Sequence, residues 1–176
     1  MNARGMGIFT GVIIGLLICL IIFKVTNKDG RMKTEYDERQ QLVRATSYKI
    51  GFYTLLGYLL LLAGIEVGEI NVHMTIDVKL YFGIMVGVTA VVIHSIWNNA
   101  YWGINNNVKR YAVIFVLATL LNAFVSFMAY KEGRLYQDGM FQSATLNLLC
   151  TIMFILIGIT IAIKAAVEKN REAEEE

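Results

Sequence analysis

Five long apolar runs set the limits on what this chain of 176 residues can fold into. Each run comes close to the roughly 20 residues that a helix needs to cross about 30 Å of hydrocarbon, and none shows the polar face of a soluble buried helix. Hydrophobic residues make up 56% of the chain and charged residues 17%, a balance typical of membrane proteins. The sequence predicts an all-α fold with helices over about 6–23, 47–68, 79–98, 110–131 and 144–167.

These helices are expected to form one integral membrane bundle spanning residues 1–176. The expected order is one N-terminal helix followed by two helical hairpins. A cytoplasmic juxtamembrane helix is predicted over about 35–49, and the acidic tail 168–176 is expected to extend the last helix into solvent. The chain contains no proline, which favours unbroken helices over the interrupted helices that carry many transporter sites.

The lysines and arginines predict the orientation of the bundle. Segments that alternate across the membrane carry twelve and four of these residues, and the richer set comprises 24–49, 98–110 and the C-terminal end. The positive-inside rule then places the C-terminus in the cytoplasm and the N-terminus outside, as in a multi-pass protein of the inner membrane. The run 6–23 is interpreted as a retained anchor, because no small-residue cleavage site follows it. The opposite orientation of this helix, with Arg4 inside, stays open.

Small and polar residues inside the runs predict how the helices pack. Glycines spaced four apart allow two helix backbones to approach closely. They occur at Gly7, Gly11 and Gly15 and again at Gly83 and Gly87. The partner is either a sister helix or a second copy of the chain. Asn122 and Asn147 are expected to form hydrogen bonds between neighbouring helices, because a polar group in hydrocarbon needs a partner. The alternative is that the two asparagines line a small polar cavity open to the outside.

The stretch "TEYDERQQLVRATSYK", residues 34–49, is the first candidate for a functional surface. Thr34 followed by Asp37 resembles a capping box, which predicts the start of a helix that runs into the next apolar run. The stretch is either a solvated helix near anionic lipid headgroups or a docking surface for a cytoplasmic partner.

The second candidate is "IHSIWNNAYWGINNNVKR", residues 93–110. If the preceding helix continues through it, His94, Asn98, Tyr101 and Asn105 fall at spacings of four, three and four on one face, where they could bind a headgroup, an ion or a peptide. Alternatively, the asparagines end the helix and form a turn, and the tryptophans anchor the chain at the membrane interface.

The sequence contains none of the residue patterns that are typical of catalytic or metal sites. The runs carry no charged residue near their centres, and the sequence contains no GxSxG, HExxH or P-loop motif. It also contains no CxxC and no Cys/His ligand pair. We therefore expect no cofactor, no metal and no nucleic-acid partner, and no residue pattern in the sequence supports an enzymatic activity.

The blocks "YDERQQLVRATSYKIGF" (36–52) and "IWNNAYWGINNNVKR" (96–110) together resemble a group of small bacterial polytopic membrane proteins with a domain of unknown function. The group has an Asp-Glu-Arg-Gln motif before one membrane helix and an aromatic, Asn-rich exit after the next. This chain differs in having Ala45 and Thr46 in a glycine region and Asn99 where Asp is frequent. Members are often encoded beside helix-turn-helix regulators, so the resemblance implies a regulatory or sensing role.

Both candidate blocks are expected on the cytoplasmic side of the bundle. Our leading hypothesis is a non-enzymatic regulatory or scaffolding protein that binds a protein partner or lipid through Asp37, Glu38, Arg39, Gln40, His94, Asn98, Tyr101 and Asn105. The alternative is a small transporter or channel-like subunit with a polar vestibule near Asn122 and Asn147.

Overall fold

The computed structural model describes residues 3–31 and 33–175, and for residues 3–9, 11, 12, 23 and 175 it describes the backbone alone. The chain forms α1 (Ala3–Thr26), α2 (Glu38–Val67), α3 (Ile76–Trp97) and α4 (Val108–Lys131). A short hairpin, β1 (Tyr136–Gln137) and β2 (Met140–Phe141), and one 3₁₀ turn, η1 (Ser143–Thr145), precede α5 (Leu146–Glu175). The prediction of a helical bundle is confirmed.

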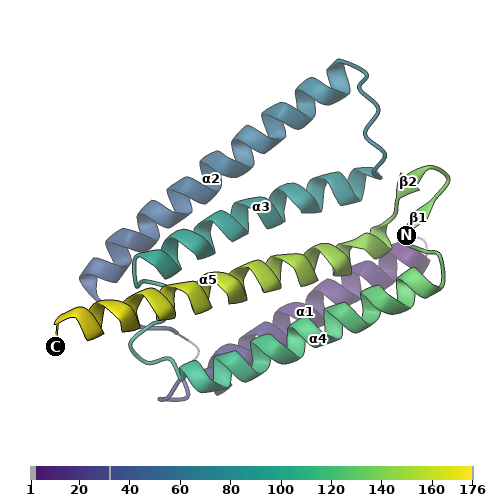
Figure 1. Ribbon diagram of the computed structural model, residues 1–176. Coiled ribbons are helices and arrows are strands. Elements are labelled where there is room, and N and C mark those ends of the chain that lie inside the picture. The colour runs from purple at the N-terminus through teal and green to yellow at the C-terminus, as the bar shows by residue number, and fades with distance from the viewer. Residues whose placement is uncertain (1–2, 32, 176) are drawn as a thin grey trace.

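The helices lie side by side in an order that differs from their order in the chain. α2 packs against α3, α3 and α4 each pack against α5, and α1 packs against α4 (Figure 1). The α1–α2 linker, the α3–α4 loop and the C-terminus lie at one end of the bundle. The α2–α3 loop, the β1–β2 hairpin and the N-terminus lie at the other.

Burial in this bundle is reversed relative to a soluble protein. In the part of the chain that the structure describes, the buried hydrophobic residues are only Val78, Ile96, Ala100, Ala129 and Ile157. The buried polar residues of the same part are more numerous: Thr26, Asn27, Ser47, Ser95, Asn105, Asn106, Ser126, Thr145 and Thr151. Large apolar side chains such as Leu16, Leu61 and Leu121 point outward and are more than 60% exposed. An outer surface of this kind is stable in lipid and not in water, where it would aggregate.

Four segments of the described chain are long and apolar enough to cross a membrane by length and composition. They are α2, α3, α4 and the segment Ser143–Glu174, and α1 contributes a shorter apolar stretch, Ile13–Thr26. The juxtamembrane helix expected over 35–49 forms the first part of α2, which runs unbroken from Glu38 to Val67, so it continues into the next apolar run as predicted.

The α2–α3 contact depends on glycines from both helices. A Cβ atom on Gly51 would lie 2.2 Å from Val91 Cγ2 and 2.9 Å from the Gly87 carbonyl oxygen. A Cβ atom on Gly83 would lie 2.3 Å from Cδ1 of the Tyr58 ring. Gly83 and Gly87 therefore face a sister helix of the same chain.

The glycines of α1 are placed differently. Gly15 has open space around the position of a Cβ atom. The surroundings of Gly7 and Gly11 lie outside what the structure describes. Gly15 thus has no neighbour that requires a glycine there.

The segment that joins α4 to α5 contains the β1–β2 hairpin, which was not predicted from the sequence. Its turn consists of Asp138 and Gly139, both with positive φ (51° and 77°), as the tightest hairpin turns require. The hairpin docks on the α2–α3 loop, since the Phe141 backbone N–H donates to the His73 carbonyl (2.8 Å) and the Thr75 N–H donates to the Phe141 carbonyl (3.1 Å).

Candidate functional site

The α1–α2 linker and the α3–α4 loop are joined by a buried pair of asparagines. Asn27 and Asn106 form an isolated β-bridge, and the Asn106 side-chain amide donates to Asn27 Oδ1 at 2.6 Å. Asn106 Oδ1 accepts the Gly103 backbone N–H at 2.7 Å, and the Asn27 amide donates to the Arg31 carbonyl at 2.7 Å. We call residues 25–31 and 33–40 together with 98–107 the junction.

Asn105 holds the next part of the linker. Its Oδ1 accepts the Glu35 backbone N–H at 2.9 Å, and its amide donates to Asp29 Oδ2 (3.1 Å) and to the Lys33 carbonyl (3.0 Å). The pKa of the Asp29 carboxyl is lowered below its usual value. The main cause is the hydrogen bond from the Arg31 backbone N–H, and the second is the bond from the Asn105 amide, because both donors stabilise the ionised carboxylate. Asn105 is 9% exposed, so its role is to fix the chain rather than to meet a ligand.

The Asp-Glu-Arg-Gln block begins α2 with a capping box, but the box starts later than the sequence indicated. Asp37, not Thr34, is the N-cap: its side chain accepts the Gln40 N–H at 2.6 Å, and Gln40 Oε1 accepts the Asp37 N–H at 3.2 Å. Thr34 lies in the linker, where its Cγ2 would be 2.3 Å from a Cβ atom on Gly103. Glu38 is the first helical residue, exposed, where a negative charge stabilises the positive end of the helix dipole.

The same block holds the α3–α4 loop by its carbonyl groups. The Gln40 amide donates to the carbonyls of Asn99 (3.1 Å) and Trp102 (3.0 Å). The Arg39 guanidinium donates to the carbonyls of Asn98 (3.2 Å) and Asn99 (3.4 Å). The structure thus brings the two candidate blocks into direct contact. Arg39 and Gln40 stabilise that contact, and Asp37 and Glu38 stabilise the start of α2.

His94, Asn98, Tyr101 and Asn105 do not share a helix face, because α3 ends at Trp97. The Asn98 amide donates back to the His94 carbonyl at 2.8 Å, and Asn99 adopts a left-handed conformation with φ of 54°. The N–H groups of Asn99 and Ala100 then close the helix end on the carbonyls of Ile96 and Ser95, as in a Schellman motif. The interpretation of these asparagines as helix-ending residues is the one that the geometry supports.

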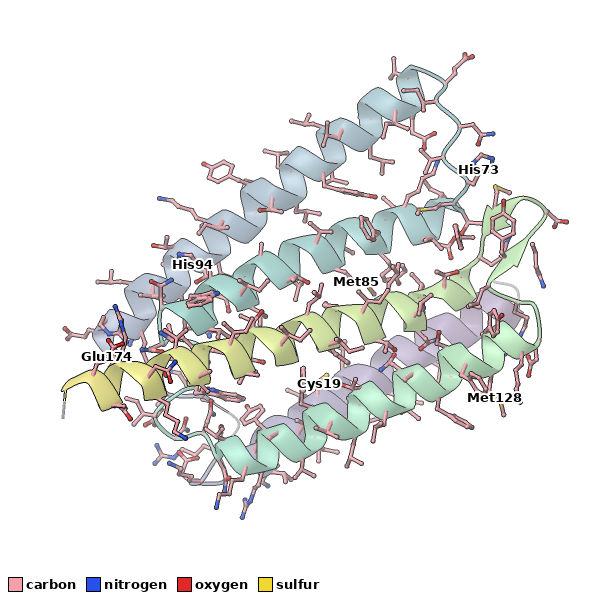
Figure 2. The ribbon with its side chains drawn as sticks, viewed as in Figure 1. Cys19, His73, Met85, His94, Met128 and Glu174 are labelled. Carbon is pink, nitrogen blue, oxygen red and sulfur yellow. The ribbon has the colours of Figure 1, made fainter. Side chains whose placement is uncertain are left out.

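His94 belongs to a polar cluster between α2 and α3 (Figure 2). Its Nδ1 lies 2.8 Å from the Ser47 hydroxyl, and the Ser95 hydroxyl lies 3.0 Å from the same oxygen. Ser47 and Ser95 are fully buried, so the cluster satisfies polar groups inside the helix pair. It is separate from the Asn98 and Asn105 contacts.

A pocket opens where the junction meets the end of α5. We call it the junction pocket, and its lining residues are Gln40, Ile96, Asn99, Tyr101, Trp102, Ile161, Lys164, Ala165 and Glu168. The Lys164 ammonium group donates to the Trp97 carbonyl (3.0 Å) and pairs with the Glu168 carboxylate (3.0 Å). The ring centroids of Tyr101 and Trp102 are 4.6 Å apart, and burial raises the pKa of the Tyr101 hydroxyl.

The Asn122 side chain, which was expected to bond to a neighbouring helix, bonds within α4, and Asn147 contributes its backbone carbonyl to a bond within α5. The Asn122 amide donates to the Ala118 carbonyl at 2.8 Å, and the Thr151 hydroxyl donates to the Asn147 carbonyl at 2.8 Å. A side chain four residues along a helix reaches a carbonyl of the preceding turn, so no neighbouring helix is needed. The groove in this region is lined by Ser126, Thr151 and mainly apolar residues, and this lining does not favour a polar vestibule.

The sequence did not point to several residues of the junction and its pocket. Asn106 and Gly103 lie within the stretch 93–110, where nothing in the pattern distinguished them from neighbouring residues, and Asn27 lies outside both candidate stretches. Lys164 and Glu168 could have been found, because they are four residues apart at the end of an apolar run, a spacing that places them side by side on a helix.

The outward apolar surface and the long apolar helices indicate an α-helical membrane protein. Comparison of the chain with protein-family models, curated proteins and solved structures finds no match. The arguments about function therefore rest on the junction and its pocket.

Proposed function

We propose that this chain is a five-span bacterial inner-membrane protein, N-terminus outside and C-terminus in the cytoplasm, with a non-enzymatic regulatory or scaffolding role. It would act by binding a segment of a cytoplasmic protein in the junction pocket. The observation that carries the proposal is the pocket itself, which lies at the end of the bundle where the lysines and arginines are concentrated.

The chemistry of the pocket favours a peptide over a bare anion. The charge of Lys164 is already matched by Glu168, so the pocket offers no unpaired cation to a phosphate. It offers instead the Tyr101 and Trp102 rings, and rigid aromatic side chains beside polar groups are typical of protein-binding sites. The junction contributes by holding this aromatic wall against α5, which is the role we assign to Arg39 and Gln40.

A photocrosslinking experiment tests this function in native membranes. Ala165 and Ala166 are adjacent, exposed residues of α5, and of the two only Ala165 lines the pocket. We expect p-benzoylphenylalanine at position 165 to give a discrete crosslinked protein adduct, and the same residue at position 166 to give none. Equal crosslinking from both positions, or no adduct from position 165, would contradict the proposed site.

The topology makes a separate prediction. In a chain whose cysteines are replaced (Cys19→Ala, Cys150→Ala), single cysteines at Asn2 and Asn71 should react with a membrane-impermeant maleimide in intact cells or spheroplasts. A cysteine at Lys33 should react only after permeabilisation, because twelve of the sixteen lysines and arginines are expected on its side. Labelling of position 33 from outside would contradict the predicted orientation of the bundle. Protection of position 2 in intact cells would contradict the prediction that α1 crosses the membrane as the fifth span.

A further inference from the structure

We infer that the groove between α2 and α3 at the junction end is a binding site for an anionic phospholipid. The inference needs α2 and α3 to span the membrane, but it does not depend on the protein partner proposed for the junction pocket. The α2/α3 groove has a floor at Gly51 and Gly87, where the two helix backbones touch. Its walls are apolar and include Phe52, Leu55 and Val88.

The dimensions of the groove match one leaflet of a bilayer. On the helices the lining residues run from 44 to 55 on α2 and from 84 to 95 on α3, and the remaining one is Tyr101 of the α3–α4 loop, which also lines the junction pocket. At 1.5 Å per residue each wall is about 16 Å long, close to half of the roughly 30 Å hydrocarbon core. An acyl chain from the leaflet at the junction end would therefore fill the groove from the interface to the midplane.

The mouth of the groove carries a positive charge. Arg44 lies about one helical turn before Tyr48, and its Nη2 donates to the Tyr48 hydroxyl at 2.7 Å. Its guanidinium carbon lies 4.0 Å from the centroid of the Tyr36 ring. Within the described residues Arg44 forms no ion pair with a carboxylate, unlike Lys79 and Lys164.

These features together fit a phospholipid with a net negative headgroup. A guanidinium group carries five N–H donors and binds phosphate in a bidentate manner, while a tyrosine beside it is typical of the membrane interface. An apolar groove of single-leaflet length that ends at a cation without an acidic partner complements a molecule with an apolar tail and an anionic head. A zwitterionic lipid would fit the groove but would gain less from Arg44.

Native mass spectrometry of the purified full chain in detergent tests the site. The probes are dioleoyl phosphatidylglycerol, dioleoyl phosphatidylcholine and glycerol phosphate, which carries the anionic head without a tail. We expect the wild-type chain to retain phosphatidylglycerol most strongly and glycerol phosphate not at all. Equal retention of both lipids, or retention of glycerol phosphate, would overturn the inference.

Matched variants separate the headgroup contact from the groove. Arg44→Gln should weaken phosphatidylglycerol retention about tenfold, the effect of losing one charge-assisted hydrogen bond. Arg44→Lys should keep most of the retention, and Lys49→Gln, which changes an exposed lysine of α2 outside the groove, should leave it unchanged. No change in Arg44→Gln, or equal losses in Lys49→Gln, would overturn the role of Arg44.

The tail contact has its own pair of variants. Val88→Phe places a larger side chain in the groove and should lower retention of both lipids. Val113→Phe changes an exposed valine of α4 that lies outside the groove, and should lower neither. If both variants retain phosphatidylglycerol as the wild-type chain does, the acyl chain does not lie between α2 and α3.

Discussion

Replacing Gly51 with leucine is expected to destabilise the α2–α3 pair by about 3 kcal/mol or more, the upper part of the range for overpacking a close contact. The reason is that a Cβ atom at this position would meet both a side chain, at Val91, and the backbone oxygen of Gly87 at 2.9 Å. Val91 could rotate away, but a backbone oxygen moves only if the helix moves. The two helices would therefore have to separate along their length.

Gly57 supplies the control, since it belongs to the same helix and, apart from its chain neighbours and the adjacent backbone of α2, no described atom lies within 4 Å of a Cβ position there. Gly57→Leu should leave stability unchanged or slightly higher, because leucine favours the helix more than glycine does. Unfolding in mixed micelles of increasing dodecyl sulfate content, followed by circular dichroism, measures both variants. Equal stability of Gly51→Leu and Gly57→Leu would show that the contact between α2 and α3 is not close.

Replacing Asn106 with alanine is expected to cost about 3 kcal/mol, the second large effect. The change leaves the Gly103 N–H and the Asn27 side-chain oxygen without their partner, and each buried unsatisfied group costs roughly 1–3 kcal/mol. The loss should appear as faster amide exchange over both 24–37 and 98–107, because Asn106 connects these segments. Hydrogen exchange with mass spectrometry resolves the two segments from the rest of the bundle.

Asn98→Ala is the matched control for Asn106→Ala. Asn98 is exposed and its amide donates to the His94 carbonyl in the last turn of α3, so its loss should change stability by no more than about 0.5 kcal/mol. The double variant Asn27→Ala/Asn106→Ala should cost less than the sum of the single changes, because both remove the same hydrogen bond. Additive single effects, or an Asn98→Ala variant as unstable as Asn106→Ala, would contradict the proposed role of the Asn27–Asn106 pair.

The candidate stretches were found from sequence because their composition differs from that of the apolar runs around them. Their roles were harder to predict. Asp37 and Thr34 both precede α2, and either residue type can cap a helix. The choice between them depends on the contacts of the linker, where Asn105 accepts the Glu35 N–H and Gly103 lies against Thr34. In the same way, His94 to Asn105 have helical spacing, but Asn99 is left-handed and places Tyr101 and Asn105 outside α3.

The β1–β2 hairpin has a local sequence signal. Asp-Gly at 138–139, flanked by Tyr136 and Phe141, is a strong local indication of a hairpin turn. The docking of the hairpin on the α2–α3 loop depends on long-range backbone hydrogen bonds that no local pattern encodes.

The sequence by itself determined the helical class, the approximate helix positions and the outward apolar surface, because these follow from local hydropathy and from chain length. Tertiary structure alone decided that α3 lies against α5 and α1 against α4, and which asparagine bridges the linker to the loop. It also decided that the Asp-Glu-Arg-Gln block supports the Asn-rich loop rather than standing free beside it. The physical reason is that these outcomes depend on contacts between residues about 60 to 80 positions apart, such as Gln40 with Trp102 and Asn27 with Asn106. A hydrogen-bonding side chain specifies the chemistry of its partner, and only the fold specifies which partner comes within reach.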